Sequence, residues 1–457
     1  MPGVPSYRGC EACRKQKKKC DQNKPACSRC TRLDIPCVGC GQRRYKFKNQ
    51  TLSPMSRGLS QSASVRAMAT MPVPSPLINS TTRVAGGLVW ALGVTDIRYE
   101  LSIYGDFLQD IPRRLGRNAA LDSSVAALTT SFEAIHVLHK PPEVFNKYAR
   151  ALWSLRRCLD DPVEAQSPET LCAIWMIVIC QGWIGSQDDQ QVCHGEAMSH
   201  LLTAAMSRNW QGSFELQLAR TLSVIVILES FYNSRIVLDH RLWDTIKDKR
   251  SQKPDAVHHR ANNLEPCHLA KTAELFRDPQ MQFDEVQSRY QSIRNDCDVL
   301  EALLSQTPMT RAAGGILTSD LAPPAKRLHV RQQTGHGILI MIALALNAVL
   351  YTHKPLGVDL ALLAVEADEL IDQAINLAEK AMQYRPLAAS ATPMCLVVAW
   401  AVTDDVLKQE RLQQLLDEYQ QDFASVRWRE QAFKMKTRLR GIARGVAEPD
   451  PIAIVIT

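Results

Sequence analysis

The cysteines near the start of the chain repeat one spacing. The sequence reads Cys10-Glu-Ala-Cys13-Arg-Lys-Gln-Lys-Lys-Lys-Cys20 and then Cys27-Ser-Arg-Cys30-Thr-Arg-Leu-Asp-Ile-Pro-Cys37. Each stretch supplies three thiolates, whereas zinc takes four ligands in a tetrahedron. Six sulfur atoms can serve two zinc ions only if two of the sulfurs are shared between the metals. The count therefore predicts a binuclear metal cluster.

The full spacing, C-x2-C-x6-C-x6-C-x2-C-x6-C, resembles the fungal zinc binuclear-cluster (Zn(II)2Cys6) domain of transcription factors in every gap. The basic residues 14–19 and the proline-containing turn at 24–27 resemble that family too. The resemblance implies a small N-terminal DNA-binding domain over residues 8–40 with two Zn2+ ions as cofactors. It implies one zinc held by Cys10, Cys13, Cys20 and Cys27, another held by Cys10, Cys27, Cys30 and Cys37, and bridging thiolates at Cys10 and Cys27.

Two other interpretations of these cysteines compete with the zinc cluster. A disulfide framework needs an oxidising compartment, and the N-terminus shows no apolar run that would act as a secretory signal. The other interpretation is a zinc module that supports only protein contacts, and the strong positive charge of the segment argues against it. Cys40 lies three residues past the sixth cysteine. We expect it to be a free thiol, because its use in place of Cys37 would break the spacing.

The two halves of the repeat differ in charge. Five of the six residues between Cys13 and Cys20 are Arg or Lys, whereas the stretch between Cys30 and Cys37 carries one Arg and one Asp. Residues 1–50 hold 13 Lys and Arg against 3 Asp and Glu, while the other 407 residues hold 41 against 44. Positive charge is therefore concentrated on the smallest module. Such a footprint suits DNA phosphates, whose neutralisation releases counterions and makes binding depend steeply on salt.

The resemblance also implies how this module would contact double-stranded DNA. A short helix that carries the basic run would enter the major groove, where lysine can donate to guanine O6 and N7. Aligned on Cys13 and Cys20, Lys17 takes the base-contacting position, and Arg14, Lys15 and Lys19 resemble phosphate-contacting positions. Lys18 completes the basic set, although many members carry an apolar residue there, and Gln16 stands where many carry a basic one. The implied target is a CGG-type triplet, in two copies if the protein is a homodimer.

Residues 41–83 are predicted to be a linker. A second basic stretch at 42–48 would extend the DNA footprint or serve nuclear import, and the sequence does not choose between these. The segment that follows is rich in Ser, Pro, Met and Thr, and its prolines exclude a long helix. No run of heptads follows the cysteines. Monomeric DNA binding and dimerisation through the larger domain therefore both remain open.

Residues 84–457 are predicted to form a large all-α domain. Ser167 is placed to cap a helix with Pro168 at its first position. Apolar residues fall on one helical face at Val144, Tyr148, Ala151, Leu152 and Leu155, and on another at Leu412, Leu415, Leu416 and Tyr419. Residues 101–210 resemble the helical regulatory region of fungal transcription factors. That resemblance implies a region for regulation, partner contacts or effector response, and the compact size of the chain resembles that of pathway-specific activators of biosynthetic gene clusters for secondary metabolism.

Two further segments have alternative interpretations. Phe283, Val286, Tyr290, Ile293, Cys297, Leu300 and Leu304 alternate spacings of three and four. This pattern fits the seam of a dimeric coiled coil or a core helix of a bundle, and we favour the core helix because three heptads are near the minimum for a stable pair. The most apolar segment, residues 337–350, is shorter than the roughly 20 residues that span a membrane. We predict a buried helix and no membrane partner.

The chain shows no phosphate-binding glycine loop, no G-x-S-x-G sequence and no zinc-hydrolase helix, so we expect no enzyme. The predicted function is a nuclear, sequence-specific regulator of genes transcribed by RNA polymerase II, in contact with the transcription machinery. The alternative is a zinc-cluster protein that represses or co-regulates mainly through protein contacts.

Overall fold

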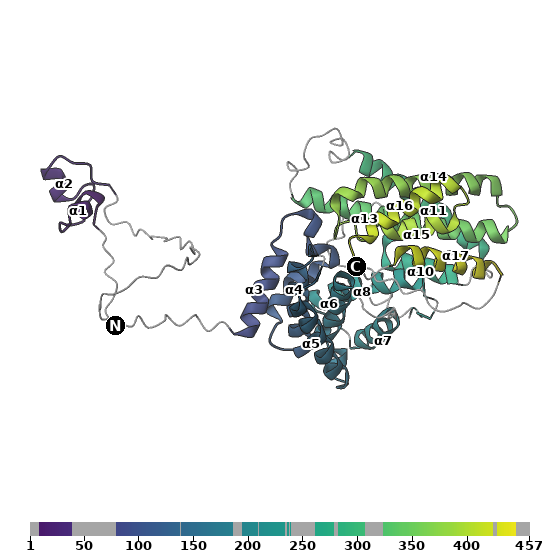
Figure 1. Cartoon of the computed structure of the whole chain (residues 1–457), viewed down its shortest axis with the longest axis horizontal. Coiled ribbons are helices and arrows are strands. Elements are labelled where there is room, and N and C mark those ends of the chain that lie inside the picture. The colour runs from purple at the N-terminus through teal and green to yellow at the C-terminus, as the bar shows by residue number, and fades with distance from the viewer. Residues whose placement is uncertain are drawn as a thin grey trace, which may run out of the picture. The chain divides into compact units, whose positions relative to one another are not determined.

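The computed structural model describes residues 9–38, 79–137, 139–185, 194–208, 210–233, 235–236, 238, 261–277, 282–306, 323–423 and 427–444. The chain divides into two compact units, Met1–Pro74 and Ser75–Thr457 (Figure 1). Cys40 and the basic stretch at 42–48 lie outside the described residues.

The first unit contains two short helices, α1 (Glu11–Lys15) and α2 (Ser28–Arg32). Each follows directly after a cysteine, Cys10 or Cys27, and each carries a second cysteine inside it, Cys13 or Cys30. The loop between the halves contains a cis peptide bond between Lys24 and Pro25, in the turn that the sequence analysis identified. Those four cysteines are buried and form the centre of this unit, which has no other hydrophobic core among its described residues.

The second unit is all-α over the residues that the structure describes, and this confirms the predicted fold class. Its α-helices are α3 (Ser80–Leu92), α4 (Ala119–Glu133), α5 (Pro142–Leu159), α6 (Pro168–Ile184), α7 (His194–Met206), α8 (Ser213–Ser230), α10 (Pro266–Arg277), α11 (Phe283–Gln306), α13 (Pro323–His353), α14 (Leu360–Ala381), α15 (Pro393–Val402), α16 (Val406–Gln420) and α17 (Trp428–Arg444). Short 3-10 turns lie at η1 (Ile97–Tyr99), η2 (Leu101–Tyr104), η3 (Asp106–Arg113), η4 (Glu164–Gln166), η5 (Asn262–Leu264) and η9 (Met382–Tyr384).

Helix starts in this unit follow from capping residues. Ser167 caps α6 as predicted, its hydroxyl accepting from the Thr170 amide at 3.1 Å, with Pro168 in the first turn. Asn79 caps α3 in the same way through the Thr82 amide at 2.6 Å. Helix α3 therefore begins at Ser80, inside the segment that we predicted as linker.

The helices enclose one continuous hydrophobic core that runs from Leu88 in α3 to Met435 in α17. Helices α4, α5 and α6 pack together near one end of this unit, and α13, α14, α15 and α17 pack together near the other (Figure 1). Tyr232, just after α8, contacts the second group, its hydroxyl donating to the Met394 carbonyl of α15 at 3.4 Å. The core cluster contains residues of both groups, so they share one core.

The predicted helix faces are mostly confirmed. All four residues of the α16 face are buried. On α5, Val144 and Ala151 are buried and Tyr148 and Leu155 are partly buried, but Leu152 is 42% exposed, so its place on the core face was wrong. The reason is that α5 buries only a narrow strip of its surface, formed by Val144, Ala151 and Ser154, and Leu152 lies outside this strip.

The two segments with alternative interpretations are both core helices. In α11 the predicted seam is buried from Val286 to Leu304, and α11 packs against α13 of the same chain. The seam is therefore covered within one chain. Helix α13 is longer than expected, with 31 residues, and by length and composition alone it could cross a membrane. However, 83% of its apolar window is buried inside the unit, which is the pattern of a core helix.

Candidate metal centre and nucleic-acid interface

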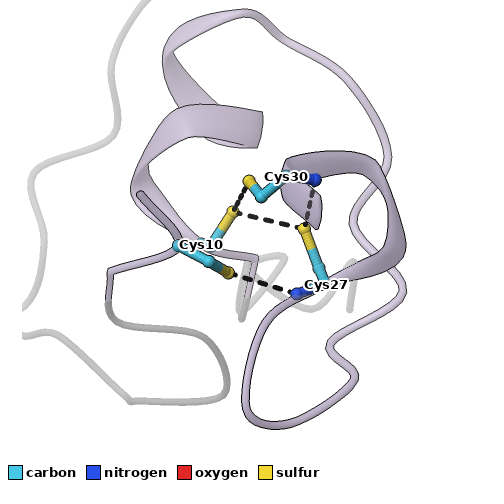
Figure 2. Close-up of side chains that lie close together, drawn as sticks. Cys10, Cys27 and Cys30 are labelled. Atoms are coloured by element: carbon cyan, nitrogen blue, oxygen red, sulfur yellow. Dashed lines mark hydrogen bonds between the residues drawn. The ribbon is translucent and has the colours of Figure 1, made fainter. Parts of the chain in front are cut away.

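The cysteine sulfurs of the first unit form two overlapping groups of four. In each group all four sulfur atoms lie within 4.8 Å of one another. The first group is Cys10, Cys13, Cys20 and Cys27, and the second is Cys10, Cys27, Cys30 and Cys37. The Sγ atom of Cys10 lies 3.8 Å from that of Cys27 and 3.5 Å from that of Cys30 (Figure 2). A zinc tetrahedron with bonds of about 2.3 Å places its sulfurs about 3.8 Å apart. The sulfurs therefore fit two zinc ions that share Cys10 and Cys27.

The shared cysteines stand at the starts of the two helices. Cys27 is the N-cap of α2, and its sulfur accepts from the Cys30 amide at 3.4 Å. This amide lowers the pKa of the Cys27 thiol, and the Cys13 amide lowers the pKa of the Cys10 thiol in the same way. By contrast, burial raises the pKa of the Cys13 thiol to about 11. The pKa is thus lowered for both thiols, Cys10 and Cys27, that the two groups share.

The two halves of the unit, residues 10–21 and 27–38, repeat each other's backbone with an offset of 17 residues. The Cys10 amide donates to the Cys20 sulfur at 3.5 Å, and the Cys27 amide donates to the Cys37 sulfur at 3.3 Å. In each half the main chain then closes a hydrogen bond five residues back, from Lys18 to Cys13 and from Ile35 to Cys30. The repeat in spacing is therefore also a repeat in structure.

Both helices end in the same left-handed turn. Lys17 has a φ of 51° and Asp34, its equivalent, has a φ of 43°. Together with the hydrogen bond five residues back, this is the Schellman ending of a helix, in which the residue after the cap is left-handed. The helix prediction was right for Arg14 and Lys15 and wrong for Lys17, Lys18 and Lys19, because α1 ends at Lys15. The lysine run therefore turns away from the helix axis.

The basic side chains of the first half face outward. Lys15, Lys17, Lys18 and Lys19 are all exposed, and the side chain of Arg14 lies outside the described residues. Lys15 is paired with Glu11 at 3.4 Å. Gln16 accepts from the Arg29 guanidinium of the second half at 2.6 Å, a contact that a lysine at position 16 could not make. The lysines of the first half are thus presented to solvent while the sulfurs of Cys10 and Cys13 are buried.

Each half also caps the helix of the other. The Glu11 amide at the start of α1 donates to the Val38 carbonyl at 3.0 Å, and the Ser28 amide at the start of α2 donates to the Asp21 carboxylate at 3.1 Å. The hydroxyl of Ser28 lowers the pKa of Asp21. Neither cap was predicted from the sequence. The available signal for the second cap was Asp21 itself, an acidic residue directly after Cys20 and before the loop that leads to α2.

Comparison with known proteins agrees with this geometry. Residues 8–46 match the family model of the fungal Zn(2)-Cys(6) binuclear cluster domain. No curated protein and no solved structure matched the chain. The N-terminal unit is therefore a fungal zinc-cluster domain that binds two zinc ions. This class of domain belongs to DNA-binding transcription regulators, which are generally nuclear and are not an enzyme family.

Proposed function

We propose that this chain is a nuclear, sequence-specific regulator of RNA polymerase II genes that reads CGG-type triplets through the first half of its zinc cluster. The observation that carries the proposal is the position of Lys17, an exposed lysine at the left-handed turn that ends α1. Asp34 occupies the equivalent turn in the second half. At this left-handed turn the first half thus presents a cation and the second half an anion, although Arg32 also places a cation in the last turn of α2.

The charge around Lys17 supports a division between base and phosphate contacts. Lysine donates well to the two acceptors on the major-groove edge of guanine. The neighbouring basic residues, Arg14, Lys15, Lys18 and Lys19, would hold the DNA backbone, which fixes orientation without reading sequence. Lys18 and Lys19 follow the turn and Lys15 precedes it, so phosphate contacts would flank the base-reading residue on both sides.

Selection from a randomised duplex library tests this proposal. Full-length protein is incubated with the library, with zinc and after chelation, and the retained DNA is sequenced. We expect CGG-type triplets to be enriched only with zinc, because a unit this small depends for its fold on the zinc ions that its six thiolates bind. The number and spacing of triplets report monomer or homodimer. Retention without enrichment would instead favour a zinc module that acts through protein contacts.

The proposal extends to activation of a biosynthetic gene cluster for secondary metabolism, because zinc-cluster regulators of this compact size resemble pathway-specific activators. A reporter gene with the selected triplets upstream tests the direction of regulation. Expression should rise with the full chain and not with a Lys17→Asp variant. A fall in expression with the full chain would identify a repressor.

A further inference from the structure

Several aliphatic side chains on α14, on α16 and in the loop before α14 are exposed. Leu356 in the loop before α14 is fully exposed, and Val406 and Leu407 at the start of α16 are 65% and 77% exposed. Leu362 and Val365 on α14 are more than half exposed as well. Single exposed aliphatic residues are ordinary, but a group of them marks an interaction site.

Ion pairs show that these residues lie together. The Lys408 ammonium contacts Asp368 at 2.7 Å and Asp372 at 2.6 Å, which fixes the first turn of α16 against the middle of α14. Val406 and Leu407 directly precede Lys408, and Val365 lies one turn before Asp368. Helices α14 and α16 are in contact. The exposed aliphatic residues of the two helices therefore share one surface.

This surface is strongly acidic. Two cations of α16 lie near the aliphatic residues, and both are paired with carboxylates of α14: Lys408 with Asp368 and Asp372, and Arg411 with Glu379. We name the surface the acidic–aliphatic end and define it by Leu362, Val365, Val406 and Leu407 with Asp359, Asp368, Asp372, Asp404 and Asp405.

Helix capping explains part of this composition but not all of it. Asp359 accepts from the amides of Ala361 and Leu362, and Asp405 accepts from the amides of Leu407 and Lys408. Those two carboxylates are N-caps. A cap does not require Val406 and Leu407 to follow it with their side chains in water. The aliphatic residues therefore have no role within the fold that would account for them.

We propose that the acidic–aliphatic end binds a basic amphipathic helix of a partner protein. Such a helix would place its apolar residues on Val406, Leu407 and Val365, in the way that amphipathic helices bind apolar surfaces. Its lysines and arginines would face the surrounding carboxylates, and this complementarity selects a basic partner over an acidic one. The inference does not depend on the DNA sequence that the zinc cluster reads.

A titration with a synthetic peptide tests the proposal. The probe is a fluorescent helical peptide of about 18 residues, or five turns, made of leucine and lysine, and its counterpart carries glutamate for lysine. The protein is the zinc-loaded full chain. We expect the lysine peptide to bind and the glutamate peptide not to bind. The double variant Val406→Gln and Leu407→Gln keeps the net charge, and we expect it to weaken binding of the lysine peptide about tenfold, since two aliphatic contacts are lost.

Two further variants control the test. Val163→Gln changes an aliphatic residue that is 62% exposed outside this surface, and binding should not change. Val365→Gln changes an exposed residue of α14 on the same surface, and we expect it to weaken binding of the lysine peptide as well. Equal affinity of the double variant and the unchanged protein would overturn the proposal. So would self-association of the full chain that Leu407→Gln abolishes in sedimentation, because the occupant would then be a second copy.

Discussion

The two halves of the zinc cluster share a backbone and differ in what they present to solvent. Cys10 to Cys20 and Cys27 to Cys37 place sulfurs, amide hydrogen bonds and left-handed turns at equivalent positions. At those turns one half has Lys17 and the other has Asp34. The comparison teaches that metal binding uses what the halves share, whereas DNA binding uses what distinguishes them.

The largest effect should come from breaking what the halves share. Cys10→Ser and Cys27→Ser each remove a sulfur that belongs to both groups of four, so we expect each variant to lose both zinc ions and the fold of the unit. Cys20→Ser and Cys37→Ser remove a sulfur from one group only. Zinc content measured on purified protein should therefore be lower for the first pair. Equal loss in all four variants would contradict the sharing of Cys10 and Cys27.

Reversing the charge of the first half comes next. Lys17→Asp copies the residue that the second half carries in the same left-handed turn, so the fold and the zinc content should stay unchanged. We expect specific DNA affinity to fall by about 3 kcal/mol, or roughly 100-fold, through loss of the base contact and repulsion by the phosphates.

Lys17→Asn is the matched control, because asparagine also accepts the left-handed conformation but brings no negative charge. Its loss of affinity should be smaller than that of Lys17→Asp. Binding of both variants to specific and random duplexes would be measured at several salt concentrations. An equal loss on the two duplexes would show that Lys17 does not read bases.

A smaller effect is expected from making the halves alike. Asp34→Lys places a cation at the second left-handed turn, and the added charge should increase affinity for all DNA and steepen its salt dependence by about one counterion. Sequence preference should not change, since the base-reading residue is untouched. A gain confined to CGG-type sites would mean that the second half also contacts bases.

The smallest effect concerns the reciprocal caps. Asp21→Asn keeps an oxygen that can accept from the Ser28 amide at the start of α2 but removes the charge. Because the pKa of Asp21 is lowered in the folded unit, its contribution to stability is present at pH values above its unfolded pKa near 4 and is lost as pH falls through the folded value. Competition with a zinc chelator at neutral pH should show slightly weaker zinc retention in the variant. Unchanged retention would assign the cap no role in stability.

The sequence predicted the chemistry of the zinc cluster better than its shape. The number and spacing of cysteines were sufficient for two zinc ions, because coordination number is a property of the metal. The end of α1 at Lys15 was not predictable in the same way, since lysine is not a typical residue for a left-handed turn. The cap from Val38 is a main-chain carbonyl, so no side chain marks it in the sequence.

In the second unit, periodicity predicted helices but only part of their environment. The face of α16 is buried as expected, whereas Leu152 on α5 has the right spacing and is exposed. Spacing defines a face of a helix, and the position of the neighbouring helices decides how much of that face is covered.

The acidic–aliphatic end could not be predicted either, because it combines residues from two helices and from the loops that precede them.

The exchange of caps between the halves of the zinc cluster bears on how the domain can change over time. Because each half completes the helix of the other, neither is a module that could be copied, lost or moved alone. The left-handed turns at Lys17 and Asp34, in contrast, accept residues of opposite charge on one scaffold. New DNA targets can therefore arise by substitution at the turns while the metal-binding framework stays fixed.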